Sequence, residues 1–255
     1  MSRVVNAWIQ LNRDARRVCK EASIRLAASA NNDPFVGIHT AFLHKATETL
    51  SAVNVLYAHK LEEPAQALIR VLFELRINFD CLLTMARQDP QDAFRRVVDS
   101  MMLEKIKQVR AAQFGGISPE HQEELENREK EIAKCYLPEE FTKLRKHGFT
   151  GIPIEQRATM TGHEVAYSIV YRNFSRNVHS TDYVESYIKT GLHTTDSDEG
   201  YRESRDIAAH YTAHFSAVGM AEFANHVFNL ELDAELEALR KRQKEIKALD
   251  PQPDT

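Results

Sequence analysis

Residues 171–183, YRNFSRNVHSTDY, combine side chains that suit chemistry on a phosphodiester. If the stretch is helical, Tyr171, Ser175 and His179 repeat every four residues, and Arg172 precedes His179 by about two turns on the same side. Arginine binds phosphate oxygens, and a histidine that titrates near neutral pH moves a proton from a ribose 2′-hydroxyl or to a leaving oxygen. The stretch therefore predicts a phosphodiester site, with a polar contact between helices as the alternative interpretation.

The spacing of arginine and histidine is not specific in itself. Arginine followed by histidine after four to six intervening residues occurs three times in the chain, about as often as chance predicts. Arg157 precedes His163 across a glycine-containing loop, and Arg205 and His210 point apart if they share a helix. Only the instance within residues 171–183 has a tyrosine and a serine on the same face. These neighbouring side chains favour this pair as the candidate site.

A charged pair lies on the most apolar predicted helix, which opens at residues 62–64 and continues to about residue 88. Arg70 and Glu74 are four residues apart, and because a buried charge is unfavourable without a partner, we expect them to neutralise each other or a third group. In the functional interpretation Glu74 orients His179 or Arg172. The alternative is a structural ion pair.

A second histidine pair suits a metal ion. His210 and His214 are four residues apart, and a third ligand would come from His44, Glu48 or Glu222. The glutamate of an HExxH motif is missing, and nothing in the spacing demands the third ligand. We therefore expect core or interface histidines and predict no metal site, with a metal-dependent hydrolase kept as an alternative.

The elements that position these residues are all predicted to be helices. Nine glycines and eight prolines are few for 255 residues, and most lie between segments with apolar residues at helical spacing. We predict an all-α fold, a helical bundle of about seven or eight helices with a long C-terminal helix from about residue 202 to 248. The remaining predicted helices cover about residues 3–29, 35–61, 62–88, the segment from Pro90 to near residue 114, a pair within 119–147 broken at Pro138, and a helix from near His163, with loops at 148–162 and 191–200.

The predicted domain organisation is one helical bundle, residues 1–230, with a peripheral charged helical insertion at about 115–150. Residues 231–255 are predicted to be a C-terminal helical extension and a disordered tail. The extension carries leucine and isoleucine at roughly heptad spacing, which predicts either pairing with a partner helix or a solvated helix lying on its own domain. Its apolar positions are Leu232, Leu236, Leu239 and Ile246.

Composition narrows the class of protein. A formal charge of −4 and a pI of about 6.3 argue against a constitutive, sequence-blind nucleic-acid binder. We find no DNA-binding motif, no phosphate-binding glycine loop, no apolar run of membrane-spanning length and no signal peptide. The three cysteines are far apart and favour a reducing compartment. These features predict a cytoplasmic protein without a cofactor or a membrane partner.

Two segments resemble an uncharacterised bacterial domain-of-unknown-function family of helical proteins. They are RVLFELRINFDCLL, residues 70–83, and YRNFSRNVHS, residues 171–180. Members of that family carry an Arg-x-x-x-Glu pair on a buried helix and a later Tyr-Arg-x-x-Ser-x-x-x-His segment. The family is in turn similar to the HEPN superfamily of helical ribonucleases and toxins, whose hallmark is Arg-x4–6-His. The resemblance covers roughly residues 40–185.

The resemblance implies a HEPN-like, metal-independent ribonuclease that acts on RNA as a toxin or antiviral defence effector. It implies a homodimer with shared sites and a protein antitoxin or regulator as partner. The alternative of another class is a non-enzymatic helical interaction or regulatory module. In the ribonuclease interpretation the catalytic residues are His179, Arg172 and Glu74, and the substrate-positioning residues are Ser175, Tyr171, Arg176 and Arg70.

Overall fold

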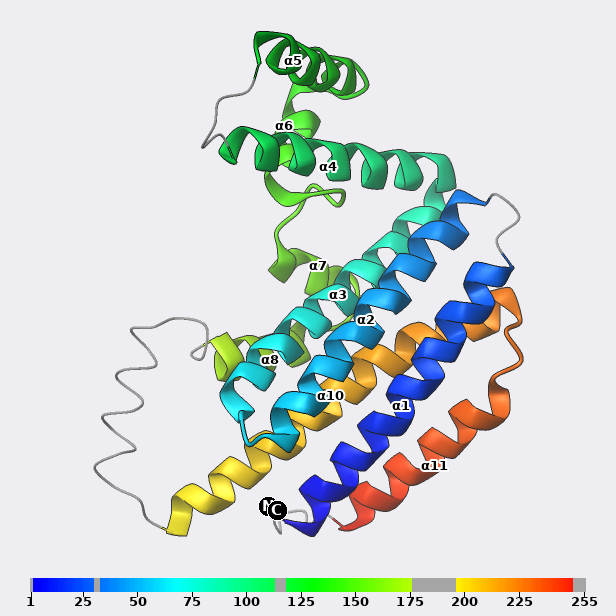
Figure 1. Cartoon of the computed structure of the whole chain (residues 1–255), viewed down its shortest axis with the longest axis vertical. Helices are drawn as coiled ribbons and strands as arrows, with labels where there is room; N and C mark the ends of the chain where they lie inside the picture. Colours follow the sequence, from blue (N-terminus) through cyan, green and yellow to red (C-terminus); the bar gives the residue numbers. More distant parts are fainter. Residues whose placement is uncertain (1, 30–32, 113–117, 176–195, 250–255) are drawn as a thin grey trace. The chain divides into compact units, whose positions relative to one another are not determined.

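The computed structural model describes residues 2–29, 33–112, 118–175 and 196–249, and within these ranges it contains ten α-helices and no strand (Figure 1). The predicted all-α class is confirmed. The helices are α1 Arg3–Ala28, α2 Pro34–Ala58, α3 Glu62–Gln88, α4 Pro90–Ala111, α5 Pro119–Lys134, α6 Pro138–His147, α7 Ile154–Met160, α8 Glu164–Ser175, α10 Asp196–Phe228 and α11 Asp233–Leu249.

An aspartate cap followed by a proline sets the start of α2 and of α4. Asp33 accepts a hydrogen bond from the amide of Phe35 at 2.9 Å, and Asp89 accepts one from the amide of Asp92 at 3.0 Å. Each cap is followed by a proline, whose missing N–H would have no partner within the first turn. These signals lie within a few residues of each boundary, and the predicted starts of α2 and α4 agree with the observed ones to within a residue.

The predicted count of seven or eight helices is too low, and α7 is one reason. It lies in the segment predicted to be a loop, residues 148–162. Its Arg157 side chain ties the helix to the preceding segment: Nε donates to the carbonyl of Ile152 at 2.8 Å, and Nη2 donates to the carbonyl of His147. Ala158 is the buried residue of this seven-residue helix, so the sequence shows no apolar periodicity there.

The second reason is that the predicted C-terminal helix is two helices. Residues 229–232 interrupt it, with Asn229 and Glu231 in the left-handed region at φ 48° and 58°. Arg25 of α1 donates to the carbonyls of Leu230 at 2.7 Å and of Glu231 at 3.0 Å. The first helix, α10, also begins earlier than predicted, at Asp196 within the expected loop 191–200.

Helix α11 therefore turns back and contacts α1 (Figure 1). The turn is braced by Asn225, whose Oδ1 accepts from the amide of Leu232 at 2.8 Å and whose Nδ2 donates to Asp233 at 2.8 Å. Of the two interpretations of the apolar stripe on this helix, the structure supports a helix that lies on its own domain. The stripe residues Leu232, Leu236, Leu239 and Ile246 are 0–5% exposed.

The chain divides into two compact units, residues 1–79 with 165–255, and residues 80–164. In the first unit the large side chains Trp8, Tyr57 and Phe73 are at most 1% exposed. Helix α1 packs against α2, α10 and α11 there. The predicted insertion at about 115–150 lies within the second unit, and the predicted boundary at residue 230 stays a prediction. Among the described helices, none is long and apolar enough to cross a membrane.

The second unit carries a small core and many ion pairs. The core consists of Leu103, Ile132, Tyr136 and Leu144. Four basic residues of α4 have acidic partners: Arg95 and Arg96 pair with Asp92, Lys107 pairs with Glu104, and Arg110 pairs with Glu129. Their charge is therefore compensated within the chain, and this helix offers little excess positive charge for a nucleic acid.

Candidate functional site

Helices α3 and α8 bring the two segments of the sequence motif together. Arg70 Nε lies 3.0 Å from Glu74 Oε1, and Arg70 Cζ lies 4.4 Å from the centre of the Tyr171 ring. The side chains of Arg70 and Glu74 are 20% and 33% exposed, so the pair is not sealed in the core as the apolar character of its helix suggested. A guanidinium that contacts both a carboxylate and an aromatic face has a restricted orientation, and solvent reaches it.

Helix α8 is anchored by one apolar face. Tyr167, Val170 and Phe174 are 8%, 5% and 2% exposed, and the Tyr167 and Tyr171 rings have centroids 5.1 Å apart. Tyr171 lies at the flank of that face, where it contacts α3. Burial at positions spaced by three and four thus explains how the helix fixes Tyr171 against Arg70.

The structure describes some of the other predicted site residues but not all of them. Arg172 and Ser175 lie on α8, directly after Tyr171 and one turn beyond it. Arg176 and His179 lie outside the described residues. The structure thus brings together Arg70, Glu74 and Tyr171, and the predicted approach of His179 to Arg172 and Glu74 stays a prediction.

A polar network that sequence analysis missed is buried around His210. Asn12 Nδ2 donates to the His210 carbonyl at 3.1 Å and lies 3.2 Å from the Nδ1 atom of the His210 ring. The Tyr57 ring centroid is 4.1 Å from that of His210. The Tyr57 hydroxyl and Gln66 Nε2 donate to Asp206 Oδ1 at 3.4 and 3.3 Å. Burial raises the pKa of Asp206. Polar residues at apolar-periodic positions of predicted helices, such as Asn12, were the available signal.

His210 and His214 do not form a metal site with the suggested third ligands. Glu222 pairs with Arg240 at 2.7 Å. His44 and Glu48 pair with each other on the exposed side of α2. Among the residues that the structure describes, no group of three or more histidine, cysteine, aspartate or glutamate side chains is arranged to hold a metal ion. His210 and His214, 0% and 3% exposed, fit the predicted role of core histidines.

We expect these two histidines to make the protein sensitive to mild acid. Burial lowers the pKa of His210 to about 3, and burial together with the nearby charge of Lys247 lowers that of His214 to about 4. The unfolded chain binds these protons near pH 6.5, so the stability of the neutral pair is present above that pH and is lost as pH falls towards 4. The free energy of unfolding should fall by about 1.4 kcal/mol per pH unit for each histidine.

Urea unfolding at several pH values between 7 and 4 measures this loss. His210→Gln should remove part of the slope, and His226→Gln, which changes an exposed histidine of α10, should leave the slope unchanged. Equal slopes for wild type and His210→Gln would show that His210 is not held neutral by burial.

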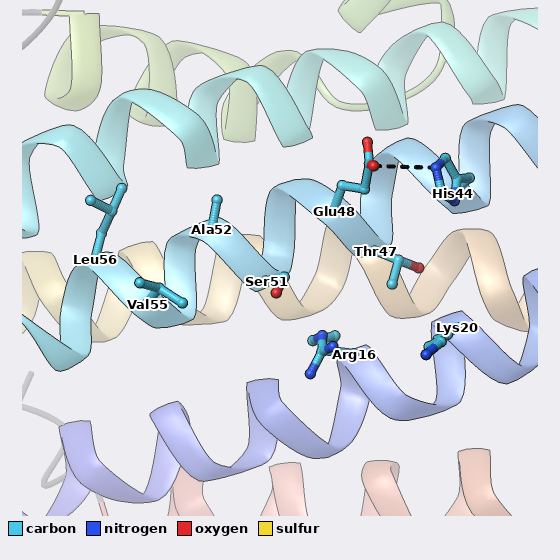
Figure 2. Close-up of a pocket in the computed structure, with 9 residues that line it drawn as sticks. All are labelled: Arg16, Lys20, His44, Thr47, Glu48, Ser51, Ala52, Val55 and Leu56. Atoms are coloured by element: carbon cyan, nitrogen blue, oxygen red, sulfur yellow. Dashed lines mark ion pairs between the residues drawn. The ribbon is translucent and has the colours of Figure 1, made fainter.

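A groove between α1 and α2 is the second feature that sequence analysis missed. It has a volume of about 600 Å³, and Figure 2 shows its two walls. Arg16 and Lys20 of α1 face α2 across it. The wall formed by α2 consists of His44, Thr47, Glu48, Ser51, Ala52, Val55 and Leu56.

Comparison with known proteins places the central part of the chain in a family. The sequence model of a family of unknown function, DUF5677, matches residues 37–197, which include both predicted motif segments. The resemblance to such a family is thereby confirmed, and similarity to HEPN proteins stays a prediction. No curated protein and no solved structure matches the chain significantly.

Proposed function

Because the chain belongs to DUF5677, a family of unknown function, we propose an activity from its own residues: a HEPN-like, metal-independent endoribonuclease. The observation that carries the proposal is the contact of Arg70 with both Glu74 and Tyr171. It attaches the Arg-x-x-x-Glu pair of α3 to the start of the segment YRNFSRNVH, at a place that solvent reaches.

The proposed roles follow from side-chain chemistry. Arg172 binds the scissile phosphate and stabilises its developing negative charge. His179 takes the proton of the ribose 2′-hydroxyl and returns one to the leaving 5′-oxygen. Glu74 and Arg70 position this segment through Tyr171. A carboxylate close to an imidazole favours the protonated form of the imidazole. Ser175 and Arg176 complete the contacts to the substrate in this proposal.

The proposed biological setting is a toxin or antiviral effector in the cytoplasm. In this proposal RNA is the substrate, two copies of the chain share their sites across a two-fold axis, and a protein antitoxin or regulator restrains the activity. These assignments rest on the family resemblance of the motif segments. If the protein does not cleave RNA, they are wrong.

The experiment compares RNA cleavage by wild type, Arg70→Gln and Arg87→Gln in the presence of EDTA. Arg70→Gln should lower the cleavage rate about 10- to 100-fold, because the group that orients Tyr171 and Glu74 is lost. Arg87→Gln changes an exposed arginine of the same helix and should stay within about twofold of wild type. Loss of wild-type cleavage in EDTA would contradict the metal-independent mechanism.

A non-enzymatic interaction module is the second candidate, favoured by the outer face of α8. Val165 and Ile169 are one turn apart and are 73% and 52% exposed. Exposed aliphatic side chains at helical spacing suit a partner surface. If wild type cuts no RNA in a total-RNA digest and does not slow growth on expression, this candidate replaces the ribonuclease.

A further inference from the structure

Two cationic side chains in the α1–α2 groove lack an acidic partner among the residues that the structure describes. Arg16 and Lys20 are one turn apart on α1 and line the same groove (Figure 2). The Nε of Arg16 is buried and has no hydrogen-bond acceptor there. Neighbouring cations of α1 differ: Arg17 pairs with Asp14, and Arg25 pairs with Glu21 at 2.7 Å. Neither Arg16 nor Lys20 forms an ion pair with a described acid, and with Glu48 as the one acidic residue of the lining the groove keeps an excess of positive charge.

The surroundings support this concentration of charge. Helix α1 carries six Arg or Lys residues and two Asp or Glu residues, whereas the whole chain has a formal charge of −4. Locally positive potential on an acidic protein attracts anions to that face.

The opposite wall of the groove changes from polar to apolar along α2. Thr47 and Ser51 present hydroxyl-bearing side chains opposite Arg16 and Lys20 (Figure 2). The Thr47 hydroxyl donates to the carbonyl of Leu43 at 2.8 Å. Further along α2, Ala52, Val55 and Leu56 form an aliphatic end, where Val55 is 55% exposed. A ligand with a charged head and an apolar body matches this gradient.

The ends of the groove favour a compact ligand over a polymer. At the polar end Glu48 Oε1 lies 3.2 Å from His44 Nε2, so the lining of the groove also contains a carboxylate. At the other end the aliphatic side chains offer no charge. A nucleic-acid backbone gains affinity from several phosphate contacts in a row, and this groove provides cations for about one.

We propose that the α1–α2 groove binds a small phosphomonoester with an apolar or aromatic body. The phosphate, with a charge of about −2 at neutral pH, lies between Arg16 and Lys20 and accepts from the Ser51 hydroxyl. The body lies on Val55 and Leu56. A volume of about 600 Å³ is within the range of small-molecule sites. The proposal does not depend on ribonuclease activity, because none of these residues belongs to the predicted RNA site.

Isothermal titration calorimetry with 1-naphthyl phosphate tests the proposal on the full chain. We expect saturable binding with a Kd of about 10 µM to 1 mM. Inorganic phosphate, which lacks the apolar body, and 1-naphthol, which lacks the charge, should each bind at least about tenfold more weakly. Arg16→Gln/Lys20→Gln should weaken 1-naphthyl phosphate at least about tenfold.

The matched control is Arg13→Gln/Lys45→Gln, which removes the same charge from exposed residues of α1 and α2 outside the groove. Its affinity should stay within about twofold of wild type. The proposal is wrong if both double variants lose affinity equally, if inorganic phosphate binds as tightly as 1-naphthyl phosphate, or if no saturable binding occurs up to about 10 mM. It is also wrong if 1-naphthyl phosphate does not bind, whereas an RNA oligonucleotide binds and Arg16→Gln/Lys20→Gln abolishes that RNA binding. Far-UV circular dichroism confirms that each variant is folded.

Discussion

His179→Ala is expected to lower the rate of RNA cleavage by about 10²- to 10⁴-fold, because a positioned general acid/base contributes about that much to a proton-transfer step. The other two histidines that follow an arginine at this spacing have different partners: the His210 carbonyl accepts from Asn12 in the core, and His163 lies 2.7 Å from Asp80. The loss should be in kcat rather than in KM, because alanine leaves the phosphate contact of Arg172 in place.

The measurement is single-turnover cleavage of a labelled RNA by wild type and His179→Ala between pH 5.5 and 8.5. His226→Ala, at an exposed histidine of α10, is the matched control and should cut at the wild-type rate. If wild type and His179→Ala cleave equally, the assignment of His179 is wrong even though the protein is a ribonuclease. If neither cleaves RNA, the ribonuclease proposal itself is wrong.

Trp8→Ala is expected to lower the free energy of unfolding by about 3–5 kcal/mol, the usual cost of removing a large aromatic side chain from a core. Trp8 is 1% exposed on α1 and has edge contacts with Tyr211 and His214 of α10 at ring-centroid distances of 5.8 and 6.0 Å. Lys247 of α11 lies 4.3 Å from the centre of the Tyr211 ring, so the cavity would open where three helices meet.

Urea unfolding at pH 7 followed by far-UV circular dichroism measures this loss, since the substitution removes the single tryptophan of the chain. Ile24→Ala is the control on the same helix; Ile24 is 53% exposed and its truncation should cost less than about 1 kcal/mol. A loss below about 1 kcal/mol for Trp8→Ala would show that the contact of α1 with α10 contributes little to stability.

The two features outside the predicted site differ in what they contribute. His210 and Asn12 are buried, so these polar groups of the network act on stability and on its pH dependence. The α1–α2 groove is open to solvent, so Arg16 and Lys20 are available to a ligand. Burial thus separates a structural use of polar residues from a binding use within the first unit.

The all-α class and most helix boundaries could be predicted because they depend on nearby residues. The starts of α2 and α4 are each predicted by an aspartate cap and a proline within the first turn, Asp33 with Pro34 and Asp89 with Pro90. Apolar periodicity likewise located the helix that carries Arg70 and Glu74. Their pairing was predictable as well, since residues four apart on a helix are neighbours.

What local sequence does not contain is contact between residues far apart in the chain. The break between α10 and α11 is held by Arg25, about 200 residues away, so a window around residue 230 looked continuously helical. The contact of Arg70 with Tyr171, the hydrogen bond of Asn12 to His210 and the groove between α1 and α2 all depend on how helices pack. Helix packing is set by the shapes of whole surfaces, and for that reason these features emerge only in the folded chain.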